Sequence, residues 1–136
     1  MADYDVKAQV PSVNDYLRIR LAAGLSRKTV EAATVGLKGS LFAVTVFCRE
    51  APVGIGRVVG DGGCFFQIVD IAVLPGYQGR GVGRLIMAAL MAYIYENAPE
   101  SAYVSLMADH GTPDFYAKFG FARAEAPASA GMYLRV

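Results

Sequence analysis

The sequence is poor in the residues that bind metals or form disulfides. It has two cysteines, one histidine and no tryptophan. Cys48 and Cys64 are too far apart for a Cys-x-x-Cys unit, and a zinc site needs more ligands than these three residues supply. We therefore expect no metal. We also expect the cysteines to behave as small apolar residues, which indicates a reducing, cytoplasmic compartment.

The sequence also lacks an excess of charge of one sign and a long apolar run. Thirteen Lys and Arg against 12 Asp and Glu leave a formal net charge of +1, too little to bind nucleic acid through bulk charge. No apolar run approaches the length of a helix that spans a bilayer. The acidic segment 1–5 lacks a following apolar core, so we do not interpret it as a signal peptide. We expect neither a nucleic acid nor a membrane as partner.

What is present indicates one folded domain over residues 1–136. Hydrophobic residues make up 54% of the chain, enough to build a core without disulfides or metal. Turn residues and apolar periodicity predict a mixed α/β sheet. The first expected elements are a strand at 4–6, a helix from Ser12 to Gly24, a helix capped by Ser26 with Val30, Ala33 and Leu37 on one face, and strands at 41–48, 53–59 and 64–74. A helix follows Gly83, and its apolar stripe is expected to consist of Leu85, Ile86, Ala89, Leu90, Tyr93 and Ile94. The last expected elements are a strand at 103–107, a short helix from Pro113 to Gly120, and a hairpin of 121–124 with 132–135.

The most informative stretch is a glycine-dense turn between a strand and a helix. Glycines at 79, 81 and 83 allow backbone N–H groups to converge on one point. That point lies at a helix N-terminus, where free N–H groups and the helix dipole favour an anion. Arg80 and Arg84 add positive charge there. These residues predict a site for phosphate groups.

Two common phosphate-binding motifs do not fit this turn. A P-loop needs Lys and Ser or Thr after its last glycine, but Arg84-Leu85 follows Gly83. A dinucleotide-binding turn needs Gly-x-Gly-x-x-Gly and a later acidic residue, which the segment 102–105 does not provide. Residues 78–83 instead fit Gln-x-x-Gly-x-Gly, which closely resembles the acetyl-coenzyme A pyrophosphate loop of the GCN5-related N-acetyltransferases. Residues 70–75 look like the fourth strand of that family.

A second block supports the same resemblance. Residues 114–121 resemble the family's late helix and the strand after it, where a tyrosine protonates the departing thiolate. That position is Tyr116, and the alternative is a core aromatic beside Phe115 and Phe119. In many members an asparagine precedes this tyrosine by seven residues, whereas this chain has Asp109. We assign His110 to the loop before the helix and not to a catalytic triad.

The resemblance covers about residues 3–136 and implies that residues 1–136 form a single N-acetyltransferase domain. The fold that it implies is a mixed, mostly antiparallel sheet with about four flanking helices. It implies transfer of an acetyl group from acetyl-coenzyme A to a primary amine by direct attack in a ternary complex. The pyrophosphate would bind the loop, and the pantetheine arm would bind the strand edge before it. The cofactor-binding residues would be Ile71, Ala72, Val73, Gln78, Gly79, Arg80, Gly81, Val82, Gly83 and Arg84.

Two interpretations of Asp70 stay open. It lies in a predicted buried strand, where an unpaired carboxylate would be costly. Asp70 is either the general base for the amine, directly or through a water, or a carboxylate held by local hydrogen bonds or by a cation such as Arg57. Arg57 itself either faces the substrate pocket or pairs with an acid.

The acceptor is expected between the segments 22–29 and 123–132. Residues 107–109, 115–116 and 131–133 look similar to the serotonin N-acetyltransferase-like branch, which favours a small-molecule amine. The alternatives are a protein or peptide acetyltransferase acting on lysine or N-terminal amines, and a non-catalytic acyl-coenzyme A-binding module. The family resemblance also makes a homodimer an expectation.

Overall fold

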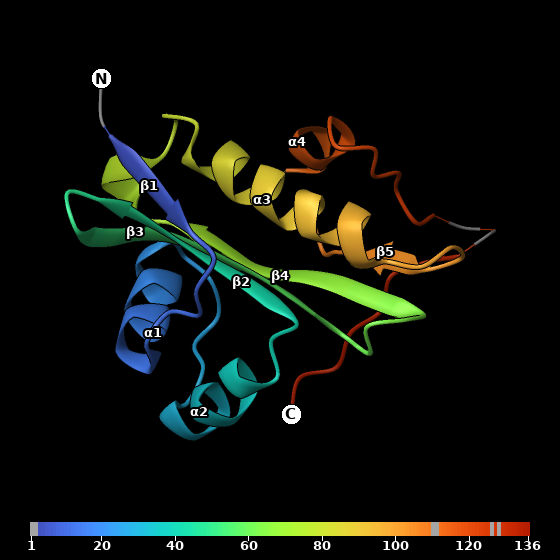
Figure 1. Ribbon diagram of the computed structural model, residues 1–136. Helices are drawn as coiled ribbons and strands as arrows, with labels where there is room; N and C mark the ends of the chain where they lie inside the picture. Colours follow the sequence, from blue (N-terminus) through green and yellow to red (C-terminus); the bar gives the residue numbers. More distant parts are fainter. Residues whose placement is uncertain (1–2, 110–111, 126, 128) are drawn as a thin grey trace. The chain divides into compact units, whose positions relative to one another are not determined.

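The computed structural model describes residues 3–109, 112–125, 127 and 129–136 (Figure 1). Its contacts divide the chain into two compact units, Met1–Ser105 and Leu106–Val136, which we describe separately. In the first unit the order is β1 (Tyr4–Lys7), α1 (Val13–Ala22), α2 (Val30–Lys38), β2 (Phe42–Cys48), β3 (Ala51–Gly60), β4 (Phe65–Val73), the 3₁₀ turn η1 (Pro75–Tyr77), α3 (Val82–Asn97) and β5 (Tyr103–Ser105). The second unit contains α4 (Pro113–Ala117).

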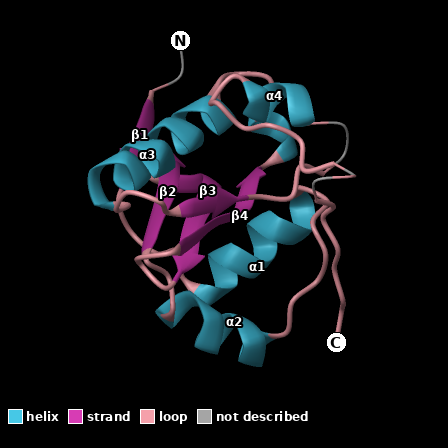
Figure 2. Ribbon diagram, turned by 90° about the vertical axis from the view of Figure 1, so that its right-hand side faces the viewer, coloured by secondary structure: helices cyan, strands magenta, loops and turns pink. Residues whose placement is uncertain are grey.

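The first unit is a twisted sheet with helices on both faces. The strand order is β1-β2-β3-β4-β5, with antiparallel neighbours except for the parallel pair β4 and β5. α1 and α2 cover one face and α3 covers the other (Figure 2). This confirms the expected mixed, mostly antiparallel sheet with flanking helices. None of the helices in the described residues is both long enough and apolar enough to cross a bilayer.

Local caps set the ends of α1. The Ser12 hydroxyl accepts a hydrogen bond of 3.1 Å from the N–H of Asp15, which satisfies one of the free donors of the first turn. Past the other end, Gly24 has a φ of +87°, a left-handed conformation that glycine adopts without strain. Both ends lie where the sequence predicts them, because the deciding contacts are local.

The predicted cap of α2 is wrong. Thr29, not Ser26, caps this helix, and its hydroxyl accepts a 3.0 Å bond from the N–H of Ala32. The carbonyl and hydroxyl oxygens of Ser26 instead accept bonds from Arg20. A tertiary contact therefore holds Ser26 in the connection and delays the helix by three residues. Val30, placed on the buried face by the sequence, is the first residue of α2 and is 62% exposed.

An aspartate organises the hairpin between β3 and β4. The Asp61 carboxylate accepts bonds from the N–H groups of Gly63, Cys64 and Phe65 at 2.8, 2.9 and 3.0 Å. These backbone hydrogen bonds, led by the bond from Phe65, lower the pKa of Asp61. The turn predicted from Asp-Gly-Gly is thus confirmed.

α3 packs tightly on the sheet, although its buried stripe is rotated from the predicted one. Leu85 is 39% exposed, and Met87 and Met91 are buried in its stead. The core residues of α3 are Val82, Ile86, Met87, Leu90, Met91 and Ile94. β3 meets this stripe with Gly54 and Gly56, because a Cβ on Gly56 would lie 2.4 Å from Cγ2 of Ile86.

In the second unit the predicted short helix is confirmed and the predicted hairpin is wrong. Pro113 begins α4, and Gly120, with a φ of +93°, follows it. Among the described residues of 121–124 and 132–135 no strand forms. Met132 and Leu134 are 90% and 88% exposed, and no strand of this unit pairs with their segment among the described residues. β5 also ends at Ser105 rather than at the predicted position 107.

We expect Gly56→Ala to destabilise the protein by about 1–3 kcal/mol, because the new methyl group overpacks against the β-branched Ile86. The matched control is Gly36→Ala within α2, where a Cβ meets nothing within 4 Å. That control should be neutral or stabilising by up to about 1 kcal/mol. Urea denaturation measures both, and equal midpoints for the two variants would contradict the packing described here.

Candidate active site

A bulge interrupts β4 just before the predicted cofactor edge. Ile55 of β3 pairs with Ala72, whereas Arg57 pairs with Val69, so β4 carries one residue more than β3 between these pairs. Asp70 lies in this bulge with a φ of +62°, which is uncommon outside glycine. The extra residue bends the strand and turns the Asp70 side chain toward α1.

Three donors from two elements hold the Asp70 carboxylate. Arg57 of β3 donates through Nε at 2.7 Å, and the Tyr16 hydroxyl of α1 donates at 2.8 Å. Arg20, also on α1, forms the third hydrogen bond and a second ion pair. The Asp70 side chain is only 7% exposed, and both arginines are buried. The structure thus pairs Asp70 with Arg57, as the second interpretation expected, and adds two partners from α1.

The tyrosine in this network is neutral. Burial raises the pKa of the Tyr16 hydroxyl, and the charge on Asp70 and the hydrogen bond to it raise this pKa further. Arg20 and Arg57 each lie 5.6 Å from the centre of the Tyr16 ring, one of the positions in which a guanidinium interacts with an aromatic face. The hydroxyl is therefore a donor, and the network contains two positive charges and one negative charge.

The two guanidinium groups also reach backbone and hydroxyl oxygens. Arg57 donates to the carbonyl of Gly36 at 3.1 Å and to the hydroxyl of Ser40 at 2.8 Å. Arg20 donates to the carbonyl and the hydroxyl of Ser26 at 2.7 and 3.2 Å. The network therefore joins α1, the α1–α2 connection, the end of α2, β3 and β4.

Sequence reasoning missed Tyr16 and Arg20. A signal was present, because Arg20 follows Tyr16 by four residues and so lies on the same face of α1, beside the fully buried Ile19. A charged residue on an apolar helix face needs a buried partner.

The glycine loop has the geometry expected of an anion site. Gly79 and Gly81 have φ values of +74° and +85°, and Gly81 is the N-cap of α3. No side chain caps this helix, so its first N–H groups are left for another acceptor. A Cβ at Gly79 or Gly81 would meet nothing within 4 Å. The left-handed backbone and the open space in front of it, rather than internal packing, account for the glycines.

The side chains around this loop differ in their contacts and in their exposure to solvent. Nε2 of Gln78 donates to the carbonyl of Val73 at 2.9 Å and so ties the loop to the end of β4. Arg80 and Arg84 are exposed, and neither forms an ion pair within the part of the chain that the structure describes. The buried Val82 anchors α3 in the core. Gln78 therefore shapes the loop, and the two arginines supply its positive charge.

The predicted edge at Ile71–Val73 lacks a strand on one side. Toward β3, Ala72 pairs with Ile55 and Val73 pairs with Gly54. Toward β5, β4 pairs only through its first three residues, Phe65–Gln67. Within the described residues, no strand continues along β4 beyond Gln67, and β4 and β5 separate there (Figure 1). An extended molecule could add along this free edge as a further strand does.

Tyr116 lies on α4 in the second unit. Its ring lies edge-on to the ring of Phe115, with 5.0 Å between the ring centres. The ring centres of Phe115 and Phe119 are 5.6 Å apart. Burial raises the pKa of the Tyr116 hydroxyl, and the charge of Asp109 raises it further. The hydroxyl is thus protonated at neutral pH. His110 lies outside the described residues.

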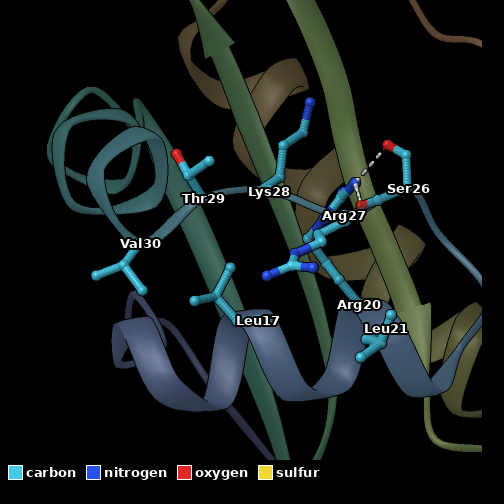
Figure 3. Close-up of a pocket in the computed structure, with 8 residues that line it drawn as sticks. All are labelled: Leu17, Arg20, Leu21, Ser26, Arg27, Lys28, Thr29 and Val30. Carbon is cyan, nitrogen blue, oxygen red and sulfur yellow. Dashed lines mark hydrogen bonds between the residues drawn. The ribbon is translucent and has the colours of Figure 1, made fainter.

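An open cleft of about 540 Å³ lies where α1 meets the start of α2 (Figure 3). Leu17 and Leu21 extend from α1, while Arg27, Lys28 and Thr29 come from the connecting segment. Arg20 and Ser26 also line it, so the Asp70 network borders the cleft. Part of the predicted acceptor segment 22–29 therefore lines a cleft. Among the described residues no group of three or more His, Cys, Asp or Glu side chains could hold a metal ion.

Residues 39–123 match the family model described as the acetyltransferase (GNAT) domain. The match covers more than half of the chain, which therefore belongs to the GNAT family. The predicted family is thus confirmed, and the matched range includes the glycine loop and the strand before it.

Known structures and sequences similar to this chain are also acetyltransferases by description or share the fold. A protein of unknown function from meticillin-resistant Staphylococcus aureus, described as a probable acetyltransferase, is 48% identical, with a TM-score of 0.92 over 98% of this chain and 100% of that one. An uncharacterized N-acetyltransferase of Porphyra purpurea is 25% identical over 104 residues, which are 74% of this chain and 59% of that protein. The matched part of this chain thus spans less than two thirds of the length of this curated relative. A Mycobacterium tuberculosis protein solved with CoA shares the fold at 18% identity and a TM-score of 0.70, over 89% of this chain and 73% of that one.

We expect Asp70→Asn to lower the stability of the protein strongly, by about 3–5 kcal/mol, because it leaves two buried guanidinium groups without a counter-charge. The control is Asp15→Asn, which breaks the exposed pair with Arg18 and should cost at most about 1 kcal/mol. Thermal denaturation measures both variants. If Asp70→Asn melts like the control but loses the acidic limb of its pH–rate profile, Asp70 is the general base instead.

Proposed function

We propose that this protein transfers an acetyl group from acetyl-coenzyme A to the primary amine of a small-molecule acceptor. The observation that carries the proposal is the uncapped N-terminus of α3 behind the left-handed Gly79 and Gly81, with open space in front. Such a terminus binds phosphate through backbone N–H groups. The pyrophosphate of the coenzyme is the expected anion, with Arg80 and Arg84 beside it.

The free edge of β4 suits the rest of the coenzyme. The pantetheine arm carries amide groups, which can pair with Ile71–Val73 along the side that β5 leaves open. The fold neighbour from Mycobacterium tuberculosis, solved with CoA, supports this assignment. The arm would then run along β4 toward the bulge at Asp70.

The reaction is direct attack of the amine on the thioester carbonyl. A backbone N–H near Val73 would stabilise the oxyanion of the tetrahedral intermediate, as fixed donors do in acyl transfer. Collapse of the intermediate forms the amide and breaks the C–S bond, and the coenzyme leaves as a thiolate. Tyr116 would protonate that thiolate, and its raised pKa keeps the hydroxyl protonated for the task. No covalent intermediate on the enzyme is needed.

The amine must lose a proton, because an alkylammonium has a pKa of about 10.4. The three donors on Asp70 support a positioning role for this residue, with water as the acceptor of the proton. In this role Asp70 holds the bulge, and with it the register of the edge that binds the thioester. The melting and pH measurements on Asp70→Asn distinguish the two roles.

We expect Gly81→Val to abolish binding of acetyl-coenzyme A in a folded protein. A β-branched residue at a φ of +85° strains the turn, and its side chain occupies the space that a phosphate would need. Isothermal titration calorimetry measures the affinity. The control is Gly76→Val in η1, where a Cβ also meets nothing within 4 Å and φ is not positive. Equal affinities in both variants would refute the loop assignment.

We expect Tyr116→Phe to leave binding of acetyl-coenzyme A nearly unchanged but to lower kcat by up to about 10²–10⁴-fold, because packing is kept while the proton donor is lost. The control is Phe115→Leu, which disturbs the neighbouring ring without removing a hydroxyl. Steady-state kinetics with detection of free thiol decide the matter. Wild-type turnover of Tyr116→Phe would show that this tyrosine serves packing alone.

A panel of small amines and lysine-containing peptides, assayed with acetyl-coenzyme A, tests the acceptor class. Release of free thiol with small amines supports the proposal. Release with peptides alone would identify a protein acetyltransferase. Tight coenzyme binding without turnover on any acceptor would identify a binding module.

A further inference from the structure

The α1–α2 cleft and the network behind it contain more positive than negative charge. Arg20 and Arg57 are both buried, and Asp70 is the single carboxylate that pairs with them among the described residues. Because Tyr16 is neutral, the buried network has a net charge of +1. An uncompensated buried charge is costly unless a counter-ion lies nearby.

One atom of this network has no hydrogen-bond partner. Nε of Arg20 is buried, and within the described part of the chain no acceptor lies within reach of it. The other two guanidinium nitrogens of Arg20 bond to Asp70 and Ser26. Arg20 is also the residue that both lines the cleft and contacts the bulge of β4. A guanidinium group with one unsatisfied, buried nitrogen therefore lies directly behind the cleft.

Two further cations line the same cleft. Arg27 and Lys28 are exposed, and neither forms an ion pair with an acidic side chain of the described residues (Figure 3). Of the eight residues that line the cleft, three are cationic and none is acidic. Glu31, in the first turn of α2, is not among them. The other five lining residues are the apolar Leu17, Leu21 and Val30 and the polar Ser26 and Thr29.

We propose that the acceptor amine also carries an anionic group, a carboxylate or a phosphate, which binds Arg27 and Lys28 in the α1–α2 cleft. This inference rests on the proposed acetyl transfer and specifies its acceptor. The anion balances the positive charge behind the cleft, while the leucines and Val30 contact the carbon skeleton. The volume of about 540 Å³ lies within the range of about 300–1,000 Å³ that is usual for small ligands.

The position of the cleft fits the chemistry. Arg20 connects it to Asp70, which immediately precedes the edge proposed to bind the thioester arm. An acceptor held by its anion at Arg27 and Lys28 can therefore extend its amine toward β4. The amine needs no charged partner of its own, since it must be neutral to attack.

The first test is anion binding, which does not require turnover. Wild-type protein saturated with coenzyme A is titrated with inorganic phosphate or with malonate at constant ionic strength, and the melting temperature is followed. Saturation with the coenzyme keeps these probes out of the glycine loop. The double variant Arg27→Gln/Lys28→Gln should raise the Kd of the preferred anion about tenfold or more, since it removes two charge-assisted contacts. Lys38→Gln, a neutralised lysine at the other end of α2, is the matched control and should bind like wild type.

The second test compares primary amines with and without an anionic group. β-Alanine is paired with β-alaninamide, and phosphoethanolamine with ethanolamine. We expect kcat/KM about tenfold or more higher for the anionic member of the preferred pair, and loss of this preference, through KM, in Arg27→Gln/Lys28→Gln. A preference for β-alanine and malonate identifies a carboxylate, and a preference for phosphoethanolamine and phosphate identifies a phosphate.

The outcomes separate this inference from the proposed function. Equal anion affinity in wild type and Arg27→Gln/Lys28→Gln overturns the inference, whether or not turnover is seen. Equal or better turnover of the neutral amines also overturns it and leaves the acetyl transfer intact. Failure of coenzyme A to bind contradicts the proposed function itself.

Discussion

The Asp70 carboxylate lies between two buried guanidinium groups, and the functional geometry of the first unit depends on this contact. Arg57 reaches it from β3, while Tyr16 and Arg20 reach it from α1. The same arginines bond to Ser26, Gly36 and Ser40. A single buried charge thus positions the first helix pair against the middle of the sheet. Its removal would leave like charges facing each other in a site from which water is largely excluded.

The bulge at Asp70 links this packing to the proposed chemistry. It falls where β4 has already left β5, so the next residues, Ile71–Val73, have one free edge. The chain then turns through η1, and Gln78 ties the loop back to Val73. The free edge and the open N-terminus of α3 therefore follow each other within 15 residues of chain, counted from Asp70 to Arg84. The charged cleft borders the same bulge through Arg20, so the proposed acceptor cleft and the proposed coenzyme edge both adjoin Asp70.

The features that the sequence predicted well depend on local interactions. Ser12 caps a helix through an N–H three residues away, and Asp61 closes a hairpin through donors two to four residues away. The glycine loop belongs to the same class, because positive φ angles at Gly79 and Gly81 are a property of the residues themselves. The errors have tertiary causes. Arg20 occupies the oxygens of Ser26 that would have capped α2, and the segment 132–135 pairs with no strand of its own unit among the described residues.

The sequence by itself determined the family, through a motif resemblance, and also the order of the main elements and the position of the glycine-rich turn, because glycine spacing and apolar periodicity act over a few residues. It also identified Asp70 as a carboxylate in need of a partner. Only the tertiary structure decided that the partners include Tyr16 and Arg20, which lie 54 and 50 positions away along the chain. The same holds for the charged cleft, whose walls come from two helices and the segment between them. A buried charge demands compensation from whatever the fold brings beside it, and that neighbour is set by packing rather than by nearness in sequence.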